Sequence, residues 1–312
     1  MRGISPRQNL KIHKKTVVTT MDSRSRLQEL LPKLVLAPSF LIVLVFVYGF
    51  IAYTGFLSMT DSKMLPSYNF VGLANYEKLW ALPHWWRALT NLGIFASLYI
   101  VICSVLGLGL AILLDQKIRA EGLLRPIYLY PMALSFIVTG TAWKWFLDPG
   151  IGLENTMHLW GWESFAFDWI KDRNYAIYCV VIAAVWQSSG FVMAMFLAGL
   201  RGVDNEIIKA AQIDGASTAT VYRRIIIPLM RPVFLSAFVV LAHLAIKAYD
   251  LVVALTGGGP GQATEVPATF MYSYTFSRHQ MAIGASSAII MLIMIFSIIV
   301  PYLYSAIRGV KR

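Results

Sequence analysis

Six long apolar stretches, four of which contain no charged residue, constrain this chain more than any other feature of its sequence. The charge-free stretches are 34–60, 88–114, 174–200 and 280–307, and each exceeds the ~20 residues that a helix needs to cross a bilayer core. Only 14% of all residues are charged, against roughly a quarter in soluble domains. The expected spans are Leu34–Met59, Leu92–Leu114, Pro126–Leu147, Tyr175–Leu200, Pro232–Leu255 and Ile283–Ile307. The sequence therefore predicts an all-α membrane protein with six transmembrane helices.

The distribution of Lys and Arg predicts the orientation of these helices. Most of the 27 basic residues fall before the first span, in 115–125, in 201–231 and in the C-terminal tail. The opposite loops hold only Lys63, Lys78, Arg87, Lys171, Arg173 and Arg278. Because Lys and Arg concentrate on the cytoplasmic side, we expect both termini in the cytoplasm. The same asymmetry accounts for the net charge of +11, so nucleic acid is not an expected partner.

The N-terminal region differs in composition from the rest of the chain. Residues 1–30 are polar and basic without periodicity, and we expect a disordered cytoplasmic segment there, with Met21 as an alternative start to Met1. Residues 31–312 carry all six spans and are expected to form a single domain.

A polar segment, residues 201–232, separates the fourth and fifth spans and is called the coupling segment below. Asp204 is a good N-cap for a short helix, and Gly215 provides a left-handed C-terminal stop. One face of this helix is expected to carry three apolar residues, Ile207, Ile208 and Ala211. A cytoplasmic helix between two spans is well placed to transmit motion from a partner protein to the membrane.

Ionisable residues inside spans are costly and usually functional. His243, Lys247 and Asp250 are spaced i, i+4 and i+7 in the fifth span, which predicts one helical face, with Tyr249 close by. Lys247 and Asp250 are expected to be able to pair directly. Such a pair serves either a transport path or simple pinning of the fifth span against a neighbour. In a third interpretation Asp250 reaches the outer interface, and the sequence leaves all three open.

Polar residues also interrupt the fourth span, at Trp186, Gln187, Ser188 and Phe191. Amides and hydroxyls beside aromatic rings suit a sugar, which offers hydroxyls to bond and C–H faces to stack. Helix packing through small residues and interhelical hydrogen bonds explains the same pattern equally well.

Catalytic sites are not evident. The run Thr256-Gly257-Gly258-Gly259-Pro260-Gly261-Gln262 is glycine-rich but lacks the Gly-Lys-Ser/Thr of a phosphate-binding loop, so we expect an irregular turn at the end of a span. Cys103 and Cys179 fall inside spans and are expected to be apolar fillers, without metal or disulfide. We expect no enzymatic activity from this chain alone.

The coupling segment and the glycine-rich turn together resemble the permease subunits of binding-protein-dependent carbohydrate ABC importers. The family's cytoplasmic signature is matched at Ala210, Ala211, Asp214, Gly215, Ala216, Tyr222, Ile225, Pro228 and Pro232. The turn, with Thr264, Glu265 and residues 271–274, resembles the sugar-permease stretch before the last span. Residues 129–134 and 245–247 look most like glucose/mannose permeases.

This resemblance implies a type I importer permease fold in the bacterial inner membrane. It implies three kinds of partner: a second homologous permease, two cytoplasmic ATPase subunits that carry ATP and Mg²⁺, and a periplasmic sugar-binding protein. Residues implied to couple to the ATPase are Asp204, Glu206, Lys209, Ala210, Ala211, Asp214, Gly215, Ala216, Tyr222 and Pro228. Residues implied in a sugar path are Trp186, Gln187, Ser188, Phe191, Lys247, Tyr249 and Asp250.

One position departs from the family pattern. Lys209 stands where the family has Glu, which reverses the charge offered to the ATPase. Either Glu206, one turn earlier, substitutes for that Glu, or the second permease retains it, and the sequence leaves both open. The alternative function is a stand-alone proton-coupled sugar transporter with Lys247 and Asp250 as its relay. Six spans without an inverted repeat argue against that alternative.

Overall fold

The computed structural model describes residues 32–33, 35–116 and 121–309, and the expectation of disorder in residues 1–30 lies outside them. The chain divides into two compact units, Met1–Phe56 and Leu57–Arg312. The described part of the first unit is helical throughout and includes the π-helix η1 (Leu44–Tyr48) and the start of α2 (Gly49–Ser58).

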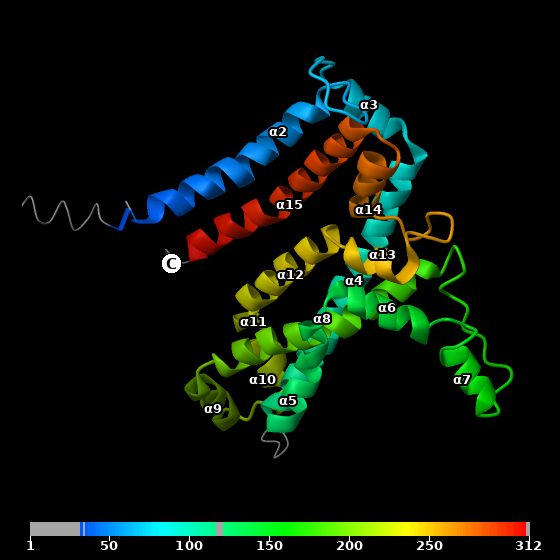
Figure 1. Ribbon diagram of the computed structural model, residues 1–312. Helices are drawn as coiled ribbons and strands as arrows, with labels where there is room; N and C mark the ends of the chain where they lie inside the picture. Colours follow the sequence, from blue (N-terminus) through cyan, green and yellow to red (C-terminus); the bar gives the residue numbers. More distant parts are fainter. Residues whose placement is uncertain (1–31, 34, 117–120, 310–312) are drawn as a thin grey trace, which may run out of the picture. The chain divides into compact units, whose positions relative to one another are not determined.

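The second unit is helical, and its described residues contain no strand beyond a single bridge between Thr60 and Phe70. Its longest helices are α4 (Pro83–Asp115), α8 (Ala176–Arg201) and α15 (Met281–Gly309) (Figure 1). The remaining elements are α3 (Ala74–Ala81), α5 (Glu121–Leu129), η2 (Tyr130–Ala133), α6 (Phe136–Phe146), α7 (Leu153–Leu159), α9 (Asn205–Ile213), α10 (Thr218–Val221), η3 (Tyr222–Ile226), α11 (Ile227–Leu229), α12 (Arg231–Ile246), α13 (Asp250–Thr256), α14 (Pro267–Tyr272) and η4 (Ser273–Ser277).

The described helices supply four unbroken candidate spans, Val35–Ser58, Pro83–Asp115, Ala176–Arg201 and Met281–Ser305. Two further candidates are bent, by 98° between α5–η2 and α6 and by 64° between α10–α11 and α12. Counting each bent pair as one span gives six. The predicted third span, Pro126–Leu147, ends within one residue of the end of the first bent pair at Phe146, whereas the helix of the fifth span ends at Ile246 rather than at the predicted Leu255.

The first break is stabilised by a neighbouring helix. After η2, Leu134 is extended, and Ser135 then caps α6 by accepting a hydrogen bond from the Val138 backbone N–H at 3.3 Å. The carbonyl of Leu134 accepts a hydrogen bond from the Gln187 side chain in α8 at 2.7 Å. Irregular backbone at membrane depth is tolerated where it is buried in protein or lines a water-filled cavity, and here the Gln187 side chain satisfies the freed carbonyl.

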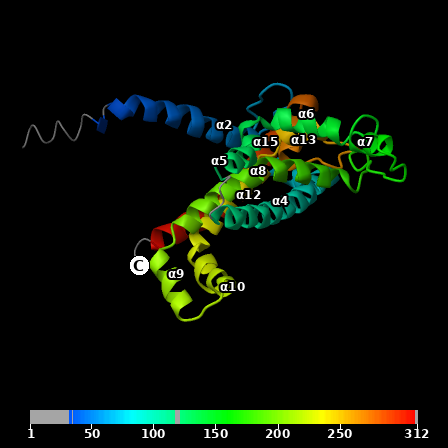
Figure 2. The ribbon, with the colours of Figure 1, turned by 90° about the horizontal axis from the view of Figure 1, so that it is seen from below.

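Helices α4 and α8 form the centre of the second unit and lie side by side in the views of Figure 1 and Figure 2. Their contacts show that they run in the same direction, because Tyr99 bonds Ser188 midway and Asp115 meets Arg201 at the C-terminal ends. A Cβ on Gly107 would lie 2.7 Å from the Val192 side chain, so glycine permits the close approach. Cys103 and Cys179 are buried in this core, as predicted for apolar fillers.

The two predicted loop motifs lie at opposite ends of this helix pair. The coupling segment follows α8 at the end where Arg201 contacts Asp115. The glycine-rich turn lies at the other end, where Arg87 near the start of α4 donates a hydrogen bond to the Gly261 carbonyl at 3.3 Å. The helix pair thus connects the two motifs through one packed core.

Gly190 tests the packing of α8 against α5, because a Cβ at this position would overlap the carbonyl oxygen of Tyr128 in α5. We expect Gly190→Ala to destabilise the folded chain by about 1–3 kcal/mol, the usual range for overpacking. Gly109→Ala in α4 is the matched control, since a Cβ there meets nothing within 4 Å. Thermal unfolding in detergent, followed by size-exclusion chromatography, measures the difference. Equal midpoints for the two variants would contradict the packing described.

Candidate functional site

The coupling segment contains the capped helix that its sequence predicts. Asp204 is the N-cap of α9, and its Oδ1 accepts a hydrogen bond from the Glu206 backbone N–H at 2.9 Å. Gly215 adopts φ +80°, the left-handed conformation that favours glycine, and the Ala216 N–H then bonds the Ala211 carbonyl at 3.0 Å. The predicted start and stop of this helix are confirmed.

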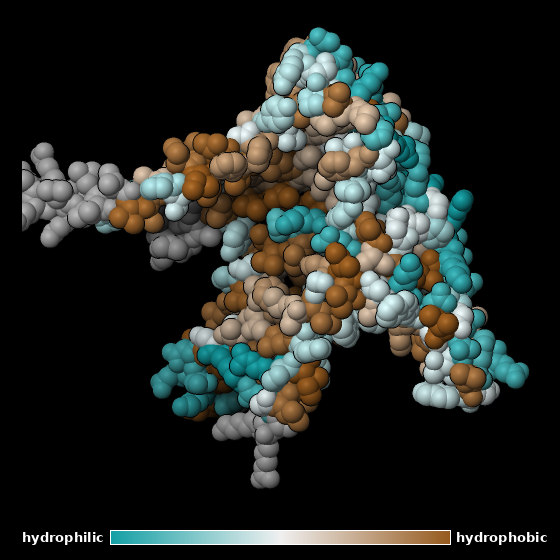
Figure 3. Space-filling view, viewed as in Figure 1, coloured by the Kyte–Doolittle hydropathy of each residue, from teal (hydrophilic) through white to brown (hydrophobic). Residues whose placement is uncertain are grey.

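The apolar residues of α9 divide between two faces. Ile208 and Ala211 pack against the core of the second unit, whereas Ile207 is 45% exposed and Ile213 is 86% exposed. Of the three residues predicted to share one face, Ile208 and Ala211 thus pack on the core, and Ile207 remains partly exposed. Figure 3 shows hydrophilic residues gathered over the α9 region. A short helix with exposed isoleucines among polar neighbours presents a surface suited to a protein partner.

The other predicted coupling residues follow this helix and its exit. Glu206, Lys209, Ala210 and Asp214 are exposed, and the three charged ones make no ion pair within the described chain. Tyr222 and Ala216 pack against the core, and Pro228 lies in α11. The charged side chains of Glu206, Lys209 and Asp214 are therefore available to a partner. Tyr222 holds the segment against the core of the second unit.

An ion pair that the sequence did not reveal fixes the start of the coupling segment. The Arg201 guanidinium lies 2.8 Å from Glu121 at the start of α5 and 3.7 Å from Asp115 at the end of α4. These side chains are 31–44% exposed, so the pairs add little stability, of order 1 kcal/mol or less. Their main effect is positional, because they tie the ends of three helices together beside α9.

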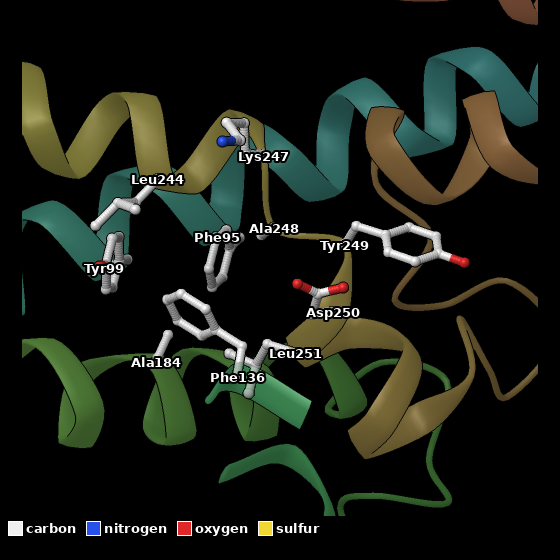
Figure 4. A pocket seen from close by; sticks show the side chains of 10 residues that line it. All are labelled: Phe95, Tyr99, Phe136, Ala184, Leu244, Lys247, Ala248, Tyr249, Asp250 and Leu251. Carbon is white, nitrogen blue, oxygen red and sulfur yellow. The ribbon is translucent and has the colours of Figure 1, made fainter. Parts of the chain in front are cut away.

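Three of the predicted path residues, Lys247, Tyr249 and Asp250, line a cavity of about 150 Å³ between α12 and α13. Its other walls come from α4, α6, α8, α12, α13 and the short segment between α12 and α13 (Figure 4). These walls are Phe95, Tyr99, Phe136, Ala184, Leu244, Ala248 and Leu251. Sequence reasoning missed Phe95, Tyr99 and Phe136 because nothing local distinguishes them from core aromatics.

The predicted helical face through His243, Lys247 and Asp250 is wrong. Helix α12 ends at Ile246, Lys247 is its C-cap, and α13 begins at Asp250. Lys247 and Asp250 are both among the described residues and form no ion pair, so their predicted pairing is not found either. In Figure 4 the Tyr249 ring points away from the cavity, and it contacts Tyr272 with ring centroids 5.0 Å apart.

The fourth-span residues lie elsewhere. Gln187 and Ser188 are buried and bonded inside the protein, Gln187 to Leu134 and Ser188 to the Tyr99 hydroxyl at 2.7 Å. Trp186 lines a separate apolar cavity with Trp143, and Phe191 packs against the core. Ser188 does not line the cavity that contains Lys247 and Asp250 (the Lys247–Asp250 cavity), and contacts it through its hydrogen bond to Tyr99. The hydrogen bond from Gln187 to Leu134 agrees with the interpretation that Gln187 serves helix packing.

The glycine-rich turn is a loop held by hydrogen bonds to its own residues and to α4. Gly257, Gly258 and Gly261 all have φ between 55° and 86°, which lets the chain turn sharply after α13. Asn91 in α4 donates to the Glu265 carbonyl at 2.8 Å, and Thr264 Oγ1 donates to the Gly259 carbonyl at 3.0 Å. The predicted irregular turn is confirmed, and internal bonds satisfy part of its backbone.

Glu265, at the end of this loop, has a buried carboxyl group. The side chain is 6% exposed, and its Oε2 atom has no hydrogen-bond partner in the described part of the chain. Burial raises the pKa of the carboxyl above its ordinary value, and the charges of His84, Arg278 and Arg87 offset only part of that effect.

Comparison with known proteins yields one family model, which matches residues 103–309 and is described as the inner membrane component of binding-protein-dependent transport systems. The chain is 42% identical over 281 residues to a probable ABC transporter permease of Pyrococcus horikoshii, covering 89% of this chain and 96% of the relative. It is 36% identical over 269 residues to a xylose/arabinose import permease of Haloferax volcanii, covering 85% and 84%. A trehalose/maltose permease of Thermococcus litoralis is 29% identical over 272 residues, covering 86% and 91%.

Solved structures share the fold at low sequence identity. A chain of a bacterial ABC transporter that imports the acidic polysaccharide alginate matches with a TM-score of 0.79 at 17% identity, covering 91% of this chain and 98% of the other. A chain of the bacterial alginate transporter bound to a pentasaccharide-loaded periplasmic protein matches equally well, covering 92% and 98%. These matches confirm the predicted type I importer permease fold.

The buried carboxyl of Glu265 predicts a pH-dependent stability. A carboxyl whose pKa is raised by folding favours the folded state when protonated, so its contribution is greatest below the ordinary pKa of a glutamate and falls as pH rises through the raised value. We expect Glu265→Gln to be more stable than the parent at pH 8, with the advantage shrinking toward pH 4. Thermal unfolding across this range measures the difference.

The matched control is Glu163→Gln, which removes an exposed carboxyl from another loop. It should leave the unfolding temperature unchanged at every pH. A Glu265→Gln variant that is no more stable than the parent at pH 8 would contradict the cost assigned to this burial.

Proposed function

Because the chain belongs to the family of binding-protein-dependent transport system inner membrane components, we propose that it is the permease subunit of an ATP-driven sugar importer. Sugar as the cargo is supported by relatives named for xylose and arabinose and for trehalose and maltose. Glucose or mannose is the finer proposal, supported by the sequence resemblance at 129–134 and 245–247.

The Lys247–Asp250 cavity is the proposed position of the sugar in this subunit. Its walls combine the aromatic rings of Phe95, Tyr99 and Phe136 with the polar groups of Lys247 and Asp250. Flat apolar rings stack on the C–H faces of a sugar, and a few polar groups fix its hydroxyls. Tyr99 in turn connects this cavity to Ser188 in α8.

Helix α9 is the proposed contact through which an ATP-hydrolysing partner drives transport. The single observation that supports it is a capped helix whose inner face packs on the core while Ile207 and Ile213 face outward. We propose that one of two cytoplasmic ATPase subunits binds this face, and that a second, homologous permease completes the path. ATP and Mg²⁺ are bound by the ATPase subunits, and this chain catalyses no reaction.

The proposed cycle is a two-state equilibrium that ATP biases through the ATPase contacts with α9. Closure of the ATPase pair moves α9, and Arg201, bonded to Glu121 and Asp115, passes that motion to α4, α5 and α8. A ligand shifts such an equilibrium only through different contacts in the two states. The membrane part opens outward, accepts sugar from the periplasmic binding protein, and returns inward after hydrolysis, in an inner membrane with both termini cytoplasmic.

The stand-alone proton-coupled transporter is not favoured. Family membership places the chain among components of a larger transport system. In addition, Lys247 and Asp250, as the structure describes them, do not pair, so they lack the contact expected of a proton relay. Uptake by this chain alone in liposomes, driven by a proton gradient, would reverse this conclusion.

Gly215→Pro tests the coupling role of α9. Proline cannot adopt φ +80° and lacks the N–H that bonds the Gln212 carbonyl at 3.1 Å, so the end of α9 is disrupted. We expect sugar uptake and ATPase stimulation to be lost while the amount of permease in the membrane stays unchanged. Radiolabelled sugar uptake and ATPase assays of the assembled transporter measure both.

Gly215→Asn is the matched control, because Asn tolerates the left-handed region and keeps its N–H. It should retain most of the uptake. Normal uptake by Gly215→Pro, or equal loss in both variants, would contradict the coupling assignment.

A further inference from the structure

A polar cavity of about 410 Å³ lies at the end of α4 and α8 opposite the coupling segment. Three segments that are far apart in sequence form it: the first turns of α4, the residues just before α8, and the glycine-rich turn. Its lining residues are Arg87, Thr90, Asn91, Arg173, Asn174 and Ala263. No sequence pattern predicts this cavity, and the cycle proposed above does not use it.

Two guanidinium groups converge in this cavity. Arg87 Nη1 donates to the Gly261 carbonyl at 3.3 Å, and a Cβ on the same glycine would lie 2.8 Å from Arg173 Nη2. Both cations therefore lie against one residue, although they belong to distant parts of the chain. Both arginines are exposed, so water screens their mutual repulsion, and their remaining N–H donors are available to an anion.

The described chain supplies no such anion. Neither arginine forms an ion pair with a described carboxylate, and Asp172 instead accepts the Asn174 backbone N–H at 2.6 Å. Glu265 acts on Arg87 electrostatically, but it is buried and makes no ion pair with it. The Thr90 hydroxyl donates to the Trp86 carbonyl, so the unused donors are chiefly those of the two guanidinium groups.

The location of the cavity indicates which partner faces these two arginines. The coupling segment and this cavity lie at opposite ends of the α4–α8 pair, and the loops of the cavity end belong to the side with few Lys and Arg. If α9 faces the cytoplasmic ATPase, the cavity faces the binding protein on which this family depends. This step rests on the function proposed above.

We propose that the Arg87–Arg173 cavity receives an acidic side chain of the sugar-loaded binding protein. A guanidinium binds a carboxylate through two parallel N–H···O bonds, and two guanidiniums at the right spacing can share one carboxylate. The bound carboxylate lies against the turn that leads back to α13, whose first residue Asp250 lines the sugar cavity. Helix α13 thereby connects the proposed docking contact to the sugar cavity.

Arg173→Glu tests the proposal in the complete transporter, reconstituted in nanodiscs with its purified, sugar-loaded binding protein. We expect the binding-protein concentration that half-saturates ATPase stimulation to rise at least about tenfold, because one of the two charges proposed to bind the carboxylate is reversed. Arg173→Gln, which removes the charge without adding another, should show a smaller rise in the same direction. It also provides the measurement if Arg173→Glu fails to assemble.

Lys171→Glu is the matched control, since it makes the same charge change two residues away at an exposed position outside the cavity. It should change half-saturation less than about threefold, and added salt should weaken docking of the parent more than that of Arg173→Gln. Equal effects of Lys171→Glu and Arg173→Glu, or no effect of either arginine variant, would overturn the proposal.

Two further outcomes separate the alternatives. Suppose that millimolar glucuronate raises the unfolding temperature of the parent but not of Arg173→Gln, while binding-protein half-saturation is unchanged in the variant. The cavity is then a site for small anions, and the docking proposal is wrong. If the binding protein fails to stimulate even the parent transporter, the proposed function itself fails, and this inference fails with it.

Discussion

The close, same-direction packing of α4 on α8 is the interaction on which the other features depend. Gly107 lets the two backbones approach, and the Tyr99–Ser188 hydrogen bond fixes their register in the middle. At one end this register brings Arg201 to Asp115 beside α9. At the other it brings Arg87 and Arg173 to one loop. A shift of one helical turn along this interface would change both ends together, which is a requirement for coupling across a membrane.

The sequence predicted features that depend on local chemistry. The unbroken spans follow from long apolar stretches, and the caps of α9 follow from the Asp204 side chain and the left-handed preference of Gly215. The family signature rests on the same local residues. These predictions succeed because each depends on neighbours within a few positions.

The features that escaped prediction depend on partners far away in sequence. The break before α6 needs Gln187 to bond Leu134, 53 residues earlier, and the end of α12 at Ile246 separates Lys247 from Asp250 in a way that apolar periodicity does not reveal. Trp85, in the first turn of α4, is fully buried against Phe270, a contact that joins residues far apart in the chain. The convergence of Arg87 with Arg173 likewise depends on tertiary packing alone.

The central claim is that α9 presents its exposed face to an ATP-hydrolysing partner, and site-specific crosslinking tests it most directly. Ile213→Cys places a thiol at a position that is 86% exposed, while Gln262→Cys places one in the turn at the opposite end of the α4–α8 pair. In membranes that contain the assembled transporter, a short crosslinker should join the thiol of the Ile213→Cys variant to the ATPase subunit. It should never join the thiol of the Gln262→Cys variant to that subunit. Crosslinks from the Gln262→Cys variant alone, or labelling of the Ile213→Cys variant by an impermeant reagent added outside, would contradict the account.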